Sequence, residues 1–254
     1  MIQNFRSRLT ASAVHLSLSL VVATVAAWLV FRVWFPYPYN EIAGGRELFT
    51  LIVTVDVILG PLLTFAVYNV AKRRHELLLD ISVIALLQAA ALGYGLWTVF
   101  LARPVYLVHE VDRFQVVVAA DIDEQALQKA LPELRKLPTW GVRTIGVRKA
   151  RDGQELMESI EQAMAGRDVS LRPDWWVPMG PGQQEILTQR GKGLDWLRSK
   201  GPAASQKVDQ VLKSLAQPEA DLWAFPVVAR STGWSALVDR KTFQVVGFVE
   251  VDGF

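Results

Sequence analysis

The chain has 254 residues, 51% of them hydrophobic, a formal net charge of +2 and no cysteine. The missing cysteine excludes disulfides, thiolate metal sites and a cysteine nucleophile. Basic and acidic residues are equal in number beyond residue 101, so the small positive excess lies in the first part of the chain. We therefore expect no nucleic-acid partner, because such a partner requires a basic patch or stripe.

Three long apolar runs occupy the first part of the chain, at about 9–35, 48–71 and 77–101. Each run is about as long as the ~20 residues that cross a ~30 Å hydrocarbon core. The alternative, three core helices of a soluble bundle, requires a polar face on each helix, and these runs are apolar on nearly all sides. The pattern predicts a three-helix transmembrane domain over 1–102.

The first run resembles a cleavable signal peptide in one respect, since Arg6 and Arg8 precede it and Val25 and Ala27 are small residues before a possible cleavage site. The apolar region of a signal peptide is about 7–15 residues long. Here the run continues through Phe31, so an uncleaved anchor is the better interpretation.

Basic residues in the short connections predict the orientation. Lys72, Arg73 and Arg74 lie in the turn between the second and third runs, and Arg6 and Arg8 precede the first. Such residues are enriched on the cytoplasmic side. We expect a cytoplasmic N-terminus, and three spans then place 103–254 outside the cytoplasm.

Four polar residues interrupt the apolar runs and form two layers by depth. At a helix rise of about 1.5 Å per residue, Arg32 and Asp56 lie towards the outer side, and His15 and Asp80 towards the inner side. Intramembrane charges usually find a partner within the bundle. We expect the pairs Arg32–Asp56 and His15–Asp80 to hold the helices together. The alternative is that one of the four is left for a partner's helix.

Gly60 and Pro61 lie in the middle of the second run. Proline has no backbone N–H and therefore removes the hydrogen bond to the carbonyl of Val57. The dipeptide predicts a kink in the second helix.

The part from 103 to 254 is predicted to be an α+β domain, because strand and helix patterns mix without regular alternation. Asp152 with Glu155 three positions later is typical of a helix N-terminus. The stretch at 172–183 is rich in proline and glycine and is expected to be loop. Strands are expected at 105–109, 114–120 and 142–150 and in three C-terminal segments, and helices at about 123–137, 152–166 and 205–215.

Motifs that carry chemistry are scarce. The chain contains no nucleophile elbow, P-loop, dinucleotide fingerprint or zinc-protease motif, and only three histidines. His109 and Glu110 are the densest polar pair near the predicted membrane surface, but alternation along a strand separates them. Asp121 and Asp123 are better interpreted as the start of a helix than as an acid–base couple. We expect no enzyme, no cofactor and no metal.

Tryptophans are frequent in the second domain. Trp175 and Trp176 are adjacent within the expected loop, and tryptophan is enriched at binding hot spots. Core packing is the alternative for all of them. The pair is a candidate for contact with a protein partner, since two adjacent tryptophans cannot easily face one core.

The segments VDVILGPLLTFAVYN, LLLDISVIALLQAAALGYGLWTV, ARPVYLVHEVDRFQVV and GWSALVDRKTFQVVGFVEVD resemble the TfpX/TfpZ type IV pilin accessory proteins. The resemblance covers most of the chain and is strongest over about 48–118. It implies a protein of the bacterial inner membrane with a periplasmic domain. It also implies a cognate type IV major pilin as partner, with inner-membrane lipid and other pilus assembly components as further partners.

A pilin's apolar helix is expected to pack against small residues of the third span, with Ala90 and Gly93 as the candidates beside Ala89 and Ala91. Pilins of this class carry a carboxylate near the processed N-terminus, and His15 is a possible partner for it. Two other classes stay open. One is a membrane-anchored sensor with a periplasmic ligand-binding domain, and the other is a membrane enzyme with a site at the outer interface.

Overall fold

The computed structural model describes residues 2–215 and 217–254. The chain divides into two compact units, one made of residues up to 37 and 45–102, the other of residues 38–44 and 103–254. The first unit is helical and the second is an α+β unit with a seven-stranded sheet. The predicted fold class is confirmed.

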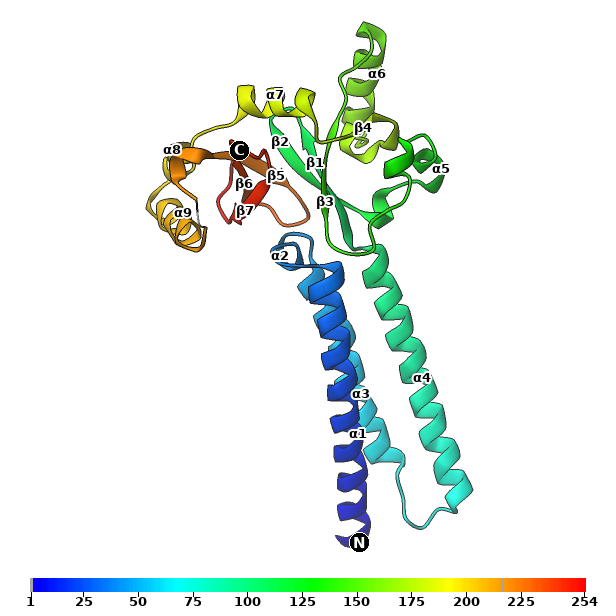
Figure 1. The fold of residues 1–254 in the computed structure, drawn as a ribbon. Coiled ribbons are helices and arrows are strands. Elements are labelled where there is room, and N and C mark those ends of the chain that lie inside the picture. The colour runs from blue at the N-terminus through cyan, green and yellow to red at the C-terminus, as the bar shows by residue number, and fades with distance from the viewer. Residues whose placement is uncertain (1, 216) are drawn as a thin grey trace. The chain divides into compact units, whose positions relative to one another are not determined.

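Three long apolar helices form the first unit (Figure 1). They are α1 (Ile2–Trp28), which continues into a π-helical segment η1 (Leu29–Trp34), α3 (Gly45–Val67) and α4 (Arg74–Leu101). By length and composition, Asn4–Trp34, Gly45–Val67 and Arg74–Leu101 can each span a membrane. The third helix begins before its apolar run, because the side chain of Glu76 accepts a hydrogen bond from the N–H of Arg73 and caps the first turn.

The three helices do not form a closed bundle. Helix α3 packs against both α1 and α4, whereas α1 and α4 scarcely contact each other. Small residues allow the close approach of α3 and α4: a Cβ atom on Gly95 would lie 2.9 Å from Cγ1 of Ile52. The first and third helices therefore flank an open side of the middle helix.

The connection at 38–44 belongs to the second unit. It contains the short helix α2 (Tyr39–Ile42). The ring of Tyr39 packs edge-on against Phe248 with centroids 5.6 Å apart. The carbonyl of Ile42 accepts a hydrogen bond from the N–H of Ser231 at 3.0 Å. Aromatic packing and a paired backbone group fix this connection against the C-terminal strands.

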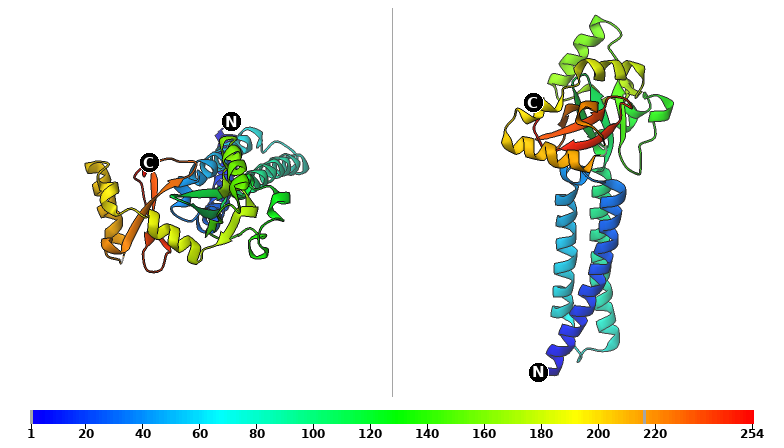
Figure 2. Two further views of the ribbon diagram at one scale, coloured as in Figure 1. Left: turned by 90° about the horizontal axis from the view of Figure 1, so that it is seen from above. Right: turned by 60° about the vertical axis from the view of Figure 1, so that its left-hand side comes forward.

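The sheet of the second unit has the strand order β4-β3-β1-β2-β5-β6-β7 (Figures 1 and 2). The pairs β1–β3 and β2–β5 are parallel and the other neighbours are antiparallel. The strands are β1 (Pro104–Glu110), β2 (Arg113–Val118), β3 (Arg143–Val147), β4 (Trp176–Pro178), β5 (Leu222–Val228), β6 (Trp234–Asp239) and β7 (Val245–Val249).

Helices and helical turns connect these strands. Asp123 caps α5 by accepting a hydrogen bond from the N–H of Gln125, as expected for the polar start of a helix. The helices are α5 (Glu124–Leu127), α6 (Gly153–Met164), α7 (Pro181–Arg190), α8 (Leu194–Arg198) and α9 (Pro202–Ser214). The 3-10 turns are η2 (Ala119–Asp121), η3 (Pro132–Leu134), η4 (Val169–Leu171), η5 (Pro173–Trp175) and η6 (Glu219–Asp221).

Two apolar clusters stabilise the second unit. The first joins buried residues of β1, β2 and β3 to Leu134, Trp175 and Trp176. The second joins α8 and α9 to β5, β6 and β7, with Leu197, Val208 and Leu237 fully buried. Each cluster covers one half of the strand order, so the single sheet carries two separate packing centres.

The expectation that 172–183 is loop was wrong. Its middle part is β4, in which Val177 is paired with Gly146 of β3 at the edge of the sheet. Its last part begins α7, with Pro181 at the first helical position. Proline is favoured there because its missing N–H would have no helical acceptor. Proline and glycine therefore mark the limits of these elements, and not one long loop.

Candidate functional site: a polar groove among the membrane helices

Asp56 lies in the middle of α3 and is paired with an amide of the next helix. The Nε2 atom of Gln88 donates to Oδ1 of Asp56 at 3.2 Å and to its backbone carbonyl at 3.1 Å. Gly60, one turn later, makes this approach possible, because a Cβ atom at that position would lie 2.0 Å from the same Nε2 atom. The amide therefore reaches Asp56 across the surface of a glycine.

The expected Arg32–Asp56 pair was wrong. Arg32 lies in the π-helical segment η1 and is exposed. Among residues 2–215 and 217–254, no ion pair involves Asp56 or Arg32. The reason is geometric: Gln88 of α4 packs directly on the face of α3 that carries the carboxylate.

The expected His15–Asp80 pair was wrong as well. Nδ1 of His15 hydrogen-bonds Oγ1 of Thr64 at 2.5 Å, because α1 packs against α3 and not against α4. Asp80 pairs instead with Nζ of Lys72 at 2.6 Å, across the turn between α3 and α4. The charge of Asp80 is therefore neutralised locally, at the end of its helix.

Gly60 and Pro61 are both buried, and α3 continues through them as one helix. Oγ of Ser12 donates to the carbonyl of Pro61 at 2.9 Å. One residue beyond the helix end, Nε of Arg8 donates to the carbonyl of Tyr68 at 2.7 Å. The contacts of α1 with α3 thus include hydrogen bonds to backbone oxygens, which are stabilising in a medium without water.

His15, Asp56 and Gln88 line a cavity between α1 and α4, with α3 at its base. The cavity has a volume of about 260 Å³. A second cavity, of about 410 Å³ and almost wholly apolar, lies between α3 and α4 and also touches Asp56 and Gln88. The first cavity, called here the polar groove, is lined by His15, Leu18, Ser19, Val22, Asp56, Ala85, Gln88, Ala89 and Leu92.

The small residues of α4 divide between these surfaces. Ala89 lines the polar groove and Ala91 lines the apolar cavity. Ala90 and Gly93, the two candidates for partner contact, are exposed and line neither cavity. No atom lies within 4 Å of a Cβ placed on Gly93. They lie on the helix face that points away from α3.

Sequence reasoning missed Gln88, Thr64 and Ser12. All three are uncharged, whereas the four polar residues singled out in the spans are ionisable. A signal existed for Gln88, since it is the one amide side chain in the third apolar run. Amides and hydroxyls bond across membrane helices as charged groups do.

The tryptophan pair of the second unit is not available for contact with a partner. Trp175 and Trp176 are only 3% and 1% exposed, so the expectation of an exposed tryptophan pair was wrong. Nε1 of Trp176 donates to the carbonyl of Ser170 at 2.8 Å. Trp175 lies under the guanidinium groups of Arg148 and Arg172, at 4.4 and 5.0 Å from its ring centroid. A bend at η5 turns the two rings into the same apolar cluster.

His109 and Glu110 are buried on adjacent positions of β1, each with its own partner. Nδ1 of His109 donates to Oε1 of Gln183 at 2.9 Å, and Oε1 of Glu110 accepts from the N–H of Ser170 at 2.7 Å. Burial lowers the pKa of His109, although Gln183 and Asp112 oppose the shift. A neutral, buried histidine is a packing residue here. Within the described part of the chain, no group of three His, Asp or Glu side chains could hold a metal ion.

Fold and site together define a membrane protein with three apolar helices, an intramembrane polar groove and an α+β unit. Comparison with known proteins narrows this class to one family. The sequence profile of a family described as "Fimbrial assembly protein FimB" matches residues 3–44. A fimbrial assembly protein of serogroup E1 from Dichelobacter nodosus is 36% identical over 254 residues, which is 99% of this chain and 98% of the relative.

A second relative from the same organism, of serogroup I, has the same identity and coverage. A third, of serogroups C1 and C2, is 43% identical over 120 residues, or 47% of this chain and 92% of that relative. No solved structure matches. The chain belongs to the fimbrial assembly protein family.

Proposed function

We propose that this chain is an inner-membrane accessory protein that binds a cognate type IV major pilin and promotes its assembly into surface fibres. One observation carries the proposal: the polar groove lies open between α1 and α4, which scarcely contact each other. Membership of the fimbrial assembly protein family supports it, as does the resemblance to the TfpX/TfpZ proteins. In this proposal the apolar N-terminal helix of the pilin lies along the groove.

The walls of the groove suit a transmembrane helix. Leu18, Val22 and Leu92 supply apolar contacts, and Ala85 and Ala89 leave room for a close approach. Small residues at a helix–helix contact allow the dispersion contacts that drive association in lipid. A fourth helix would convert an open arrangement of three into a four-helix bundle.

The polar residues of the groove supply specificity. Asp56 is bonded to the neutral amide of Gln88, and no described basic side chain forms an ion pair with it. A carboxylate within a membrane is costly unless a partner compensates it. A hydrogen-bond donor or a positive charge on the incoming helix would relieve that cost. His15 lines the same groove and can donate a hydrogen bond to an acid. It is the proposed contact for the carboxylate near the pilin N-terminus.

Orientation follows from the basic residues near the N-terminus and in the turn at 71–76. We propose that both lie in the cytoplasm and that 103–254 lies in the periplasm, where pilin heads wait before assembly. Contact with inner-membrane lipid follows from the exposed apolar faces of the three helices. No catalytic step and no cofactor are part of the proposal.

Filling the groove tests the proposal. Ala89→Leu places a larger side chain in the groove, while Ala90→Leu places the same side chain on the face that lines neither cavity. We expect Ala89→Leu to abolish surface fibres and co-purification of the pilin, and Ala90→Leu to leave both intact. Protein level in the membrane is the control for folding. Equal fibre formation in the two variants would contradict a partner in the groove.

A further inference from the structure

Helix α6 presents an apolar stripe that no other part of the described chain covers. Figure 2 shows the helix projecting from the sheet. Leu156, Met157, Ile160 and Met164 recur at helical spacing and are exposed, Met164 by 85% and Met157 by 60%. In a solvated helix such a stripe is unfavourable, because each exposed apolar side chain forgoes the free energy that its burial would gain.

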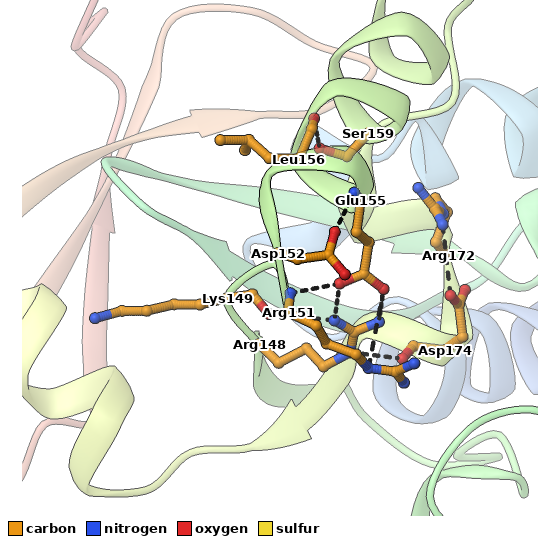
Figure 3. Close-up of polar contacts among 9 residues, drawn as sticks. All are labelled: Arg148, Lys149, Arg151, Asp152, Glu155, Leu156, Ser159, Arg172 and Asp174. Carbon is orange, nitrogen blue, oxygen red and sulfur yellow. Dashed lines mark hydrogen bonds and ion pairs between the residues drawn. The ribbon is translucent and has the colours of Figure 1, made fainter.

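The helix is nevertheless held firmly at its N-terminus (Figure 3). Asp152 caps it by accepting from the N–H of Glu155 at 2.8 Å. Glu155 in turn accepts two hydrogen bonds from Arg148, at 2.8 and 2.7 Å, and one from the N–H of Arg151 at 2.6 Å. These bonds to the charged carboxylate lower the pKa of Glu155 to about 2. The stripe is therefore presented in one orientation before any partner arrives, which lowers the entropy cost of binding.

The turn between β1 and β2 extends the apolar surface. Val111 is 52% exposed and has a φ of 42°, an unfavourable backbone conformation for a β-branched residue. A cavity of about 250 Å³ separates this turn from α6, with Val111, Ile160, Ala163 and Val169 among its lining residues. Backbone strain of this kind persists where the surroundings impose it and often marks binding sites. The name α6 surface is used below for Val111, Leu156, Met157, Ile160 and Met164.

Methionine content favours a protein partner. The chain has four methionines, and two of them lie on the α6 surface. Methionine is flexible and polarisable, and is over-used at binding surfaces that adapt to a partner.

The charges around the α6 surface select the kind of partner. Asp112, Glu158, Glu161 and Asp168 lie on or beside it, and none of them forms an ion pair with another described residue. Of the arginines near α6, Arg113 pairs with the buried Glu110, both Arg148 and Arg151 pair with Glu155, and Arg167 follows the helix end. The border of the apolar stripe is therefore acidic.

An acidic border disfavours two occupants. Helices that lie on membranes carry Lys and Arg on their polar face, because bilayers with anionic lipids repel carboxylates. A second copy of this chain, docked by the same surface, would bring acidic borders together. A protein with an apolar patch bordered by Lys or Arg fits both features.

We propose that the α6 surface is a docking site for the folded part of the fimbrial subunit that lies outside the membrane, bound through an apolar patch with a basic border. The inference rests on the proposed function and adds a second contact to the groove. Two linked contacts raise the effective concentration of each part of the subunit at its site. The subunit's helix and its folded part are then held by different units of this chain.

Site-specific crosslinking in cells that make fimbriae tests the inference. The chain has no cysteine, so Met164→Cys introduces a unique thiol for a photoreactive maleimide, and Ala89→Cys does the same in the groove. Trp140→Cys is the matched control, since Trp140 is also apolar and 73% exposed but belongs to another surface. We expect capture of the fimbrial subunit from 164 and from 89, and not from 140.

Two further variants test the chemistry of the contact. Met157→Ser should lower the capture yield from 164 about tenfold, the usual effect of removing one buried apolar side chain from an interface. The double change Glu158→Lys and Glu161→Lys should lower it several-fold, while Glu133→Lys, a charge reversal away from α6, should not. Unchanged thermal unfolding of each variant in detergent shows that the fold is intact.

The outcomes separate this inference from the function on which it rests. Capture from 89 without capture from 164 overturns the docking site and leaves the groove proposal standing. Capture of lipid, of a second copy or of an unrelated protein from 164 also overturns it. Capture from neither position overturns both.

Discussion

Gly60→Ala tests whether the amide of Gln88 is held across the surface of α3. The added methyl group would lie 2.0 Å from Nε2 of Gln88, which is shorter than any van der Waals contact distance between the two atoms. Gln88 must therefore rotate away, and both of its hydrogen bonds to Asp56 are lost. The matched control is Gly93→Ala, because nothing lies within 4 Å of that position.

The magnitude follows from two opposing effects. A hydrogen bond between membrane helices contributes about 0.6 kcal/mol on average and about 1.7 at most, so the lost pair costs about 1–3 kcal/mol. Replacing glycine by alanine in a helix gains about 1 kcal/mol, and this gain is common to both variants. The free energy of unfolding of Gly60→Ala should therefore fall about 1–3 kcal/mol below that of Gly93→Ala.

The assay is reversible unfolding in mixed micelles, with both changes repeated in a Gln88→Ala background. Without the amide, Gly60→Ala should behave as Gly93→Ala does, because nothing is left to displace. Equal stability of the two single variants in the presence of Gln88 would refute the proposed contact.

Three further predictions concern the α+β unit. Trp176→Ala should destabilise the protein by about 3–5 kcal/mol, the usual effect of emptying a buried aromatic site, so chemical denaturation should show a shifted midpoint and not merely a loss of partner binding. The pKa of His109 is lowered by burial, so the unfolded chain, in which that pKa is about 6.5, takes up a proton more readily than the folded protein. Lowering the pH from 7 to 5 therefore favours unfolding and should lower the melting temperature. His109→Leu should flatten that dependence. The pKa of Glu155 is lowered to about 2, so its ionised carboxylate stabilises the fold above its unfolded pKa, and this stabilisation is lost as pH falls towards 2. The difference in melting temperature between the wild type and Glu155→Gln should therefore shrink over that interval. A constant difference would contradict the role of the charge.

Composition was sufficient to predict the three helices and the strands at both ends of the α+β unit, because long apolar runs and β-branched alternation are local signals. The pairing of the membrane polar groups was not local. Position along each helix puts His15 and Asp56 inside the apolar spans, but it does not say which helix faces meet. Since α3 lies between α1 and α4, His15 forms a hydrogen bond with Thr64, and Asp56 forms one with Gln88.

The tryptophan pair shows a second limit. Adjacent residues face opposite sides only if the backbone stays extended, and η5 ends between Trp175 and Trp176. The turn brings both rings into one cluster, a change that no residue pattern announces. Conversely, the start and extent of α6 were predicted from the sequence, but only the structure shows that its apolar face is left uncovered.

Crosslinking from two neighbouring positions of α4 tests the central claim most directly. A photoreactive group at Ala89 points into the polar groove, and one at Ala90, about 100° further round the same helix, lies on a face that lines neither cavity. Both variants are expressed in cells that make fimbriae, and the captured protein is identified by mass. Capture of the fimbrial subunit from 89 and not from 90 is the predicted result. Capture from 90 alone, or from neither position, would contradict a groove that holds the subunit's helix.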